Sequence, residues 1–173
     1  IFNMKFDVII SNPPYQLSDG GNGKSAKPIY QHFVNMAKKM NPRYISMIIP
    51  SRWFSGGKGL DDFRKEMLSD KRIRRLVDYE NFKDIFPGVD LAGGACYFLW
   101  ERDYNGICEI TNYNKDILST KERYLDEYEI FIRQNLAVEI VTKITQTTKS
   151  FLSDKVSSRK PFGLPTNYEP KNE

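Results

Sequence analysis

The chain has 173 residues, enough for one domain with a sizeable hydrophobic core and too few for two large domains. Hydrophobic residues make up 40% and charged residues 28%, as in ordinary soluble globular proteins, and the net charge of +4 is compatible with nucleic-acid binding without indicating it. No apolar run approaches the roughly 20 residues of a membrane-spanning helix and no signal-peptide pattern is present, so we expect a cytoplasmic protein without a membrane partner.

The cysteines and the histidine argue against two kinds of site. Cys96 and Cys108 are too few and too far apart for a metal cluster, and nothing else indicates a secreted disulfide fold. His32 is the only histidine and has no second ligand or nucleophile near it in the sequence. We therefore predict no metal site and no histidine-based catalytic triad.

The first element is a short apolar run that ends in two prolines. Residues 8–10 are Val-Ile-Ile, all β-branched, which predicts a strand buried on both faces. The strand stops at Pro13 and Pro14, because proline has no N–H for a strand ladder and restricts the residue before it. Residues 11–15 are therefore expected to form a stiff turn at the carboxyl end of a buried strand, where open α/β sheets bind ligands.

This turn carries two hydrogen-bond acceptors and a flat ring. The acceptors are the side-chain carbonyl of Asn12 and the backbone carbonyl of Pro13, and the ring belongs to Tyr15. Together they suit a planar heterocycle with an exocyclic amine, such as adenine, because the amine donates twice while the ring stacks. The alternative is a Pro-Pro turn that only reverses the chain.

The rest of the sequence predicts an α/β protein. Strand, helix and strand follow one another, which implies a right-handed parallel crossover with the first two strands as neighbours. A later strand follows its predecessor too closely for a helical crossover and is expected to be antiparallel. Helices are predicted at 28–40, 60–68 and 135–149, and strands at 44–50, 73–78, 93–100 and 107–113.

The motif Asn12-Pro13-Pro14-Tyr15 resembles the catalytic motif of the N6-adenine-specific DNA methyltransferases of restriction-modification systems. The same four residues occur in methyltransferases that modify glutamine in release factors. The long glycine-rich loop after Tyr15 and the extended chain beyond Trp100 favour the DNA enzymes. The resemblance covers roughly residues 6–100 and continues more weakly to about residue 163.

The resemblance implies transfer of a methyl group from S-adenosylmethionine to N6 of an adenine flipped out of double-stranded DNA. Asn12, Pro13, Pro14 and Tyr15 would be catalytic, and Tyr15 would also stack on the base. Phe86, in a Phe-Pro pair, would hold the other side of the base, unless it is a core residue of a loop. Where the family places a lysine soon afterwards, this chain has Val89. In loop 18–25 and just after it, Lys24 and Lys27 would contact DNA phosphates or be solvated.

The resembled fold is a class I, Rossmann-like methyltransferase sheet with an antiparallel last strand. The glycine-rich loop and acidic positions that hold S-adenosylmethionine precede the motif in that family and have no counterpart in this sequence. We therefore expect a cofactor-lacking part of a larger enzyme, inactive alone, with residues 1–117 as the C-terminal half of the catalytic domain. The charged composition after Leu118 predicts that residues 118–173 form a helical and extended connector toward a target-recognition domain.

Without that N-terminal half the first strand would have a bare apolar edge. Such edges pair with other strands, so we expect self-association with Asp7 to Ile10 at or near the contact. Two further functions stay open on the sequence alone: methylation of protein glutamine, and a non-catalytic binding or structural role.

Overall fold

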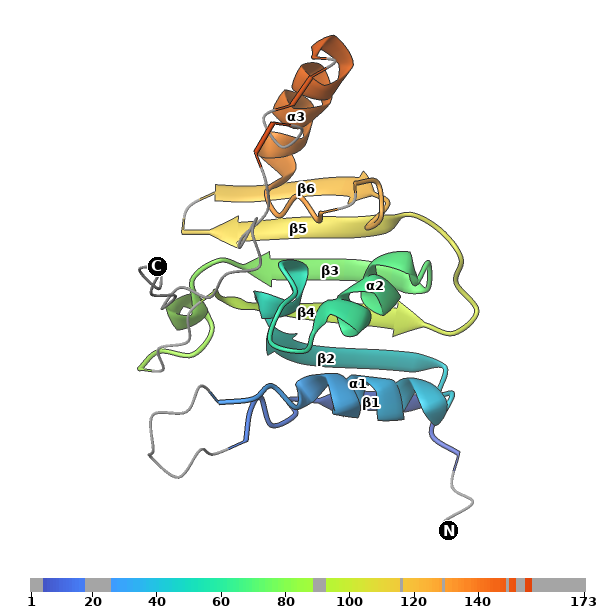
Figure 1. The fold of residues 1–173 in the computed structure, drawn as a ribbon. Helices are drawn as coiled ribbons and strands as arrows, with labels where there is room; N and C mark the ends of the chain where they lie inside the picture. Colours follow the sequence, from blue (N-terminus) through green and yellow to red (C-terminus); the bar gives the residue numbers. More distant parts are fainter. Residues whose placement is uncertain are drawn as a thin grey trace, which may run out of the picture. The chain divides into compact units, whose positions relative to one another are not determined.

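The computed structural model describes residues 5–17, 26–88, 93–115, 117–128, 130–148, 150–151 and 155–156. The chain divides into two compact units, Ile1–Ala137 and Val138–Glu173. The first unit contains a six-stranded mixed sheet in the order β1-β2-β4-β3-β5-β6 (Figure 1). The strands are β1 Val8–Ser11, β2 Tyr44–Pro50, β3 Ile73–Tyr79, β4 Ala95–Glu101, β5 Cys108–Asn114 and β6 Ile117–Arg123. The helices are α1 Tyr30–Lys39, α2 Asp61–Ser69 and α3 Asn135–Thr147, with short 3-10 helices η1 Ser51–Phe54 and η2 Phe82–Asp84.

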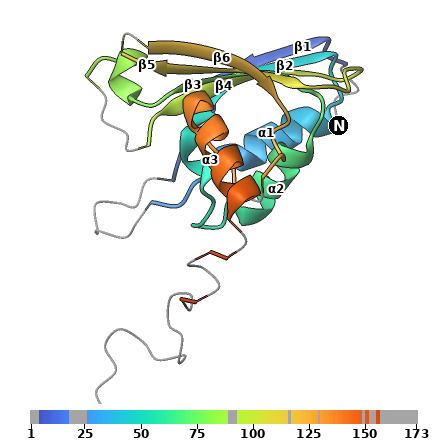
Figure 2. The same ribbon diagram turned by 90° about the horizontal axis from the view of Figure 1, so that it is seen from above.

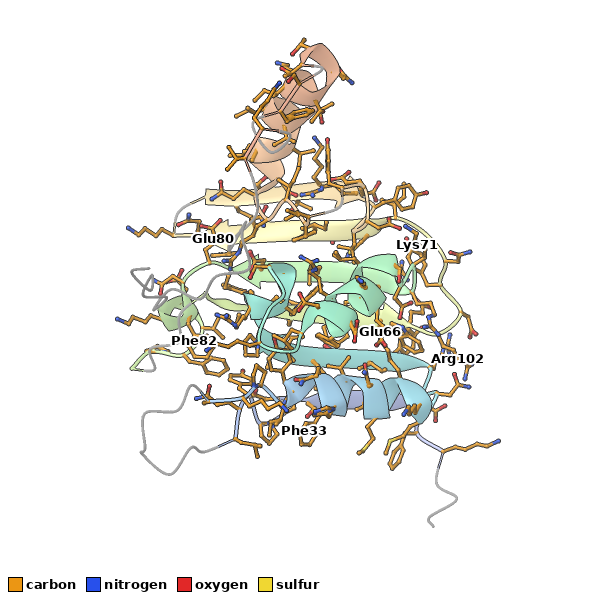
Figure 3. All side chains as sticks on the ribbon, in the orientation of Figure 1. Phe33, Glu66, Lys71, Glu80, Phe82 and Arg102 are labelled. Carbon is orange, nitrogen blue, oxygen red and sulfur yellow. The ribbon has the colours of Figure 1, made fainter. Side chains whose placement is uncertain are left out.

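The strand directions bring four strand ends to one edge of the sheet. β1 is parallel to β2, and β3 is parallel to β5, while β4 lies antiparallel between β2 and β3. The predicted pairing of the first two strands and the antiparallel fourth strand are thus confirmed. β1, β2, β3 and β5 all end at what we call the carboxyl edge (Figure 1). Glu80 and Phe82 lie at this edge, and Lys71 and Arg102 lie at the opposite end of the sheet (Figure 3).

The hydrophobic core lies between the sheet and helices α1 and α2, which cover the same face (Figure 2). β2 shows the alternation expected of such a strand, since Ile45, Met47 and Ile49 are buried against the helices while the residues between them are less buried. Trp53 and Trp100 are fully buried in the same core. This packing fixes the end of β2, and with it the segment that follows β2 at the carboxyl edge.

β1 is less buried than its sequence predicts. Val8 is 50% and Ile10 is 80% exposed, and only Ile9 packs against the core. The prediction of a strand buried on both faces is therefore wrong. Among the described residues β1 has a neighbour on one side only, and no described helix of Ile1–Ala137 covers its open face. The bare strand edge is present as expected, and self-association through it stays a prediction.

β6 lies in part of the segment that the sequence predicts to be a solvated connector. It pairs with β5 along its length, and the Thr111 and Thr120 hydroxyls lie 2.9 Å apart across the pair. Arg123, at its end, is 3% exposed and donates to Glu127, Asn135 and the carbonyl of Ile132. Residues 118–123, which the sequence predicts to be part of the connector, therefore belong to an edge strand of the sheet. The last residues of the sequence, 157–173, lie outside the described part, and a role toward target recognition stays a prediction.

A glycine at the start of β4 lets three segments approach one another. Gly94 has φ +76°, and a Cβ there would lie 2.1 Å from the carbonyl oxygen of Tyr79 and 2.6 Å from that of Glu80. Gly57 has a similar φ of +74° but open space around it. We expect Gly94→Ala to lower the free energy of unfolding by about 2–5 kcal/mol, through strain and overlap together. Gly57→Ala should cost about 1 kcal/mol, from the backbone alone. Equal losses in urea unfolding of the two variants would contradict this packing.

Candidate functional site

The turn after β1 presents two unpaired acceptors at the carboxyl edge. Pro13 is buried and anchors the turn, while Asn12 is exposed. Within the described part of the chain, neither the Asn12 side chain nor the Pro13 carbonyl takes part in a hydrogen bond. Asn12 is therefore not held by its own backbone, and both oxygens are free to accept from a ligand.

Tyr15 is fixed by its backbone and by one ring contact. Its carbonyl accepts from the N–H of Ile29 at 3.1 Å, and Leu17 N–H donates to the carbonyl of Lys27 at 3.1 Å, beside a bridge between Gln16 and Pro28. The half-buried ring meets Phe82 edge-on, with 6.2 Å between centroids and 85° between planes. Burial, and then the charge that Cys96 would carry, raise the pKa of Tyr15, so the phenol stays protonated.

Phe82 joins the two aromatic residues that the sequence predicts to hold a base. Phe86 is half-buried and lies 5.1 Å from Phe82 between centroids, at 34°, and the Phe86 N–H donates to the Phe82 carbonyl at 3.0 Å. Phe82 itself is 4% exposed and so serves as the support for both rings. Sequence analysis missed Phe82, although Asn81 caps the helical turn that begins there. The structure thus brings Tyr15 and Phe86 to one edge, while Lys24 and Val89 lie outside the described residues.

Behind this edge a buried carboxylate on β3 joins the segment after β2 to the segment before α3. Asp78 is fully buried and accepts from the Ser51 hydroxyl at 2.7 Å and from Arg133 at 2.5 and 2.9 Å. Arg133 also reaches the carbonyl of Tyr79, and the Ser51 N–H donates to the carbonyl of Gly94. Burial raises the pKa of Asp78 in spite of the guanidinium, which acts in the opposite direction. Because its oxygens are occupied, Asp78 acts as a structural anchor and not as an exposed base.

A hollow of about 300 Å³ opens at the end of β2. We call it the Arg52 hollow. Its lining residues are Ser51, Arg52, Phe54, Ser55, Gly93, Ile130, Phe131 and Arg133.

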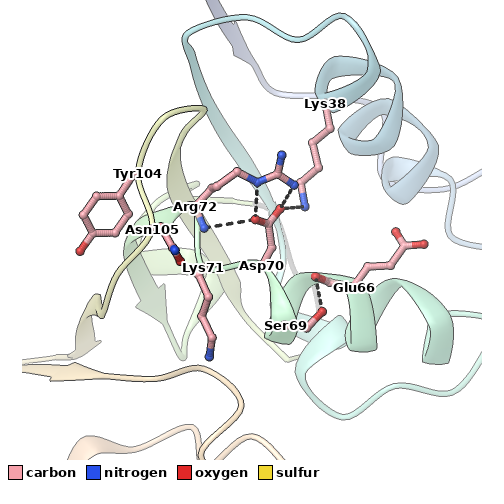
Figure 4. A pocket seen from close by; sticks show the side chains of 8 residues that line it. All are labelled: Lys38, Glu66, Ser69, Asp70, Lys71, Arg72, Tyr104 and Asn105. Atoms are coloured by element: carbon pink, nitrogen blue, oxygen red, sulfur yellow. Dashed lines mark hydrogen bonds and ion pairs between the residues drawn. The ribbon is translucent and has the colours of Figure 1, made fainter.

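A second hollow, of about 570 Å³, is lined by residues that include Glu66 and Lys71 (Figure 4) and lies toward the opposite end of the sheet (Figure 3). Its basic side chains are already paired: Asp70 binds Lys38 at 2.8 Å and Arg72 at 2.7 Å, and Lys71 binds Asp126. Burial raises the pKa of Asp70, but the hydrogen bonds from Arg72 and Lys38 outweigh it and lower the pKa overall. With its lysines and its arginine already paired and no link to the turn after β1, this hollow is a weak candidate for the site.

The acidic residues of the described part do not gather into a metal-binding cluster. Among the described residues no group of three His, Cys, Asp or Glu could hold a metal ion. Asp61, Asp78, Glu80 and Asp84 each accept a hydrogen bond within the chain. In the described part, no helix is both long and apolar enough to cross a membrane.

The Asp78–Arg133 pair makes a prediction about pH. Arg133→Met leaves the buried carboxylate without its cation and should lower the free energy of unfolding by about 3–5 kcal/mol at pH 7. Because Arg133 acts to lower the pKa of Asp78, its removal raises that pKa still further above the ordinary 3.8, so the folded variant takes up a proton at a higher pH than the folded unaltered protein and gains more stability as the pH falls. The loss should therefore shrink as the pH falls toward 4.5. Urea unfolding at both pH values measures it, with the exposed Arg102→Met as control, and an equal loss at both would contradict the account.

Comparisons with known proteins give a consistent picture. Residues 1–86 match the sequence model of the Eco57I restriction-modification methylase family. A protein of Mycoplasma pneumoniae described as an uncharacterized adenine-specific methylase is 35% identical over 92% of this chain. The match covers 41% of that protein, so the chain spans about two fifths of the length of its curated relative.

Among solved structures, the type IIG restriction endonuclease BpuSI shares the fold. It matches 81% of this chain and 22% of its own, with 14% identity and a TM-score of 0.53. The methyltransferase subunit of a type I restriction-modification system from Streptococcus thermophilus matches 86% of this chain and 33% of its own, with 13% identity and a TM-score of 0.47.

Proposed function

Because this chain is a relative of the restriction-modification adenine methyltransferases, with residues 1–86 matching the Eco57I restriction-modification methylase family, we propose that it carries the base-binding part of such an enzyme. The reaction is transfer of a methyl group to N6 of an adenine in double-stranded DNA. The observation that carries the proposal is the pair of unbonded acceptors, Asn12 Oδ1 and the Pro13 carbonyl, beside the fixed ring of Tyr15.

The two acceptors address the main chemical difficulty of the reaction. The exocyclic amine of adenine is a poor nucleophile because its lone pair is delocalised into the ring. When Asn12 and Pro13 accept its two hydrogens, the nitrogen is drawn toward tetrahedral geometry and its lone pair becomes available. Orientation and electrostatic stabilisation then lower the barrier without a strong base, which agrees with the protonated state of Tyr15.

The aromatic residues would hold the base once it leaves the helix. Extrusion of the adenine costs a few kcal/mol, and stacking on an aromatic ring returns roughly 1–3 kcal/mol per base. Tyr15 supplies one such ring, and Phe86 is assigned to the other side of the base. Their shared contact with Phe82 supports this assignment, since it fixes both rings to one supporting side chain.

The methyl donor of the proposed reaction is S-adenosylmethionine, which supplies an electrophilic methyl group. We assign it no residue of this chain, because in the resembled family the glycine-rich loop and the acidic positions that hold it precede the Asn-Pro-Pro-Tyr motif. The proposal also includes the finer fold assignment, to the C-terminal part of a class I methyltransferase sheet. The antiparallel strand β4 between β2 and β3 supports it.

A labelling experiment on the full-length natural protein tests this function. The protein is incubated with tritiated S-adenosylmethionine and, in separate reactions, genomic DNA and a bacterial release factor. We expect label in DNA, recovered after digestion to nucleosides as N6-methyldeoxyadenosine. Label in the release factor alone would replace the proposal with protein-glutamine methylation, and label in cytosine would contradict the assignment to adenine.

A further inference from the structure

One arginine at the carboxyl edge has no partner for its charge. Arg52 is exposed and, among the nine arginines in the described residues, is the one without a hydrogen bond, ion pair or ring contact from its side chain. Six others bind a carboxylate, Arg64 donates to the Ser55 carbonyl, and Arg43 lies over the Tyr44 ring. Those six are Arg72, Arg74, Arg75, Arg102, Arg123 and Arg133.

The backbone beneath Arg52 is held rigidly. Its neighbours Ser51 and Trp53 are 3% and 0% exposed, the Ser51 hydroxyl binds Asp78, and the Trp53 indole N–H lies 3.4 Å from the Cys96 sulfur. The Arg52 carbonyl accepts from both the N–H and the hydroxyl of Ser55. Because the backbone is already fixed, binding of a ligand by Arg52 orders the side chain alone and requires no rearrangement of the chain beneath it.

The Arg52 hollow has the chemistry of a site for a phosphate and a sugar. The hollow is lined by two arginines. Arg133 is paired with Asp78, so Arg52 supplies the positive charge that is left uncompensated. Ile130, 65% exposed, forms an apolar rim beside the ring of Phe54. A guanidinium matches phosphate oxygens in a bidentate fork, and an apolar rim packs against a deoxyribose.

The hollow lies at the same end of the sheet as the proposed base site. Arg52 is close enough to Tyr30 for its charge to oppose the rise that burial causes in the pKa of that phenol. The N–H of Ile29, the residue before Tyr30, donates a hydrogen bond to the carbonyl of Tyr15. The strand register also places the turn after β1 and the segment after β2 at the same end of the sheet, since Ser11 pairs with Met47, four residues before Ser51.

From this geometry we propose that Arg52 binds a backbone phosphate of DNA close to the flipped nucleotide, with the adjoining sugar against Ile130. The assignment rests on the proposed function and goes further, by naming the residue that anchors the strand. It makes Arg52 a positioning residue. A phosphate contact carries no sequence information, so Arg52 should strengthen binding to all duplexes alike.

The test is the salt dependence of DNA binding by the full-length protein, measured by fluorescence anisotropy with a labelled duplex of arbitrary sequence. Each phosphate contact contributes about 0.9 to the slope of log K against log salt, so Arg52→Gln should lower the slope by about 0.9. Arg52→Lys should keep the slope of the unaltered protein. Arg102→Gln, at the opposite end of the sheet (Figure 3), removes an exposed and already paired charge and should also leave the slope unchanged.

An unchanged slope in Arg52→Gln, or an equal drop in Arg102→Gln, would overturn the assignment. If the Arg52 assignment is overturned in this way, methylation of DNA by the unaltered protein would show that the proposed function stands without a phosphate contact from Arg52. Failure of the unaltered protein both to bind and to methylate DNA would overturn the two together. Equal melting temperatures of Arg52→Gln and the unaltered protein establish that the variant is folded.

Discussion

The parallel pairing of β1 with β2 is the constraint on which the site depends. It places the end of β1 beside the end of β2, so the stiff Asn-Pro-Pro-Tyr turn and the Ser51–Phe54 helix open on the same edge of the sheet. Pro13 is buried and cannot continue the ladder, which leaves Asn12 exposed with its amide oxygen unbonded. The local sequence thus determines the shape of each of these two segments, and the strand directions place both at the same edge of the sheet.

A second constraint holds the remaining strands at that edge. Asp78 joins the end of β3 to Ser51 after β2 and to Arg133 before α3, and Gly94 admits this approach because it has no side chain. The aromatic group of Tyr15, Phe82 and Phe86 is built on the same edge from segments that follow β1 and β3. The hydrogen bonds of Asp78 and the packing on Phe82 therefore both fix the acceptors and the aromatic rings in place without burying the surface that they form.

The sequence predicted what depends on neighbouring residues. The turn after Ile10, the crossover from β1 to β2 and the antiparallel β4 follow from apolar runs, prolines and connection lengths, and all are present. Contacts between distant residues were not predictable: Arg133 is 55 positions from Asp78, and nothing near Phe82 marks it as the support of Tyr15. β6 was missed because the charges on an edge strand resemble those of a connector, and β1 was read as buried because its apolar run does not reveal which neighbours it has.

The central claim is that Asn12 activates the target amine by accepting one of its hydrogens, and single-turnover methyl transfer by Asn12→Ala tests it most directly. Asn12 is exposed, so its removal leaves the packing intact. The account predicts that the rate constant for methyl transfer to DNA falls by roughly 100-fold or more while the affinity for DNA changes little. A rate constant equal to that of the unaltered protein would contradict it.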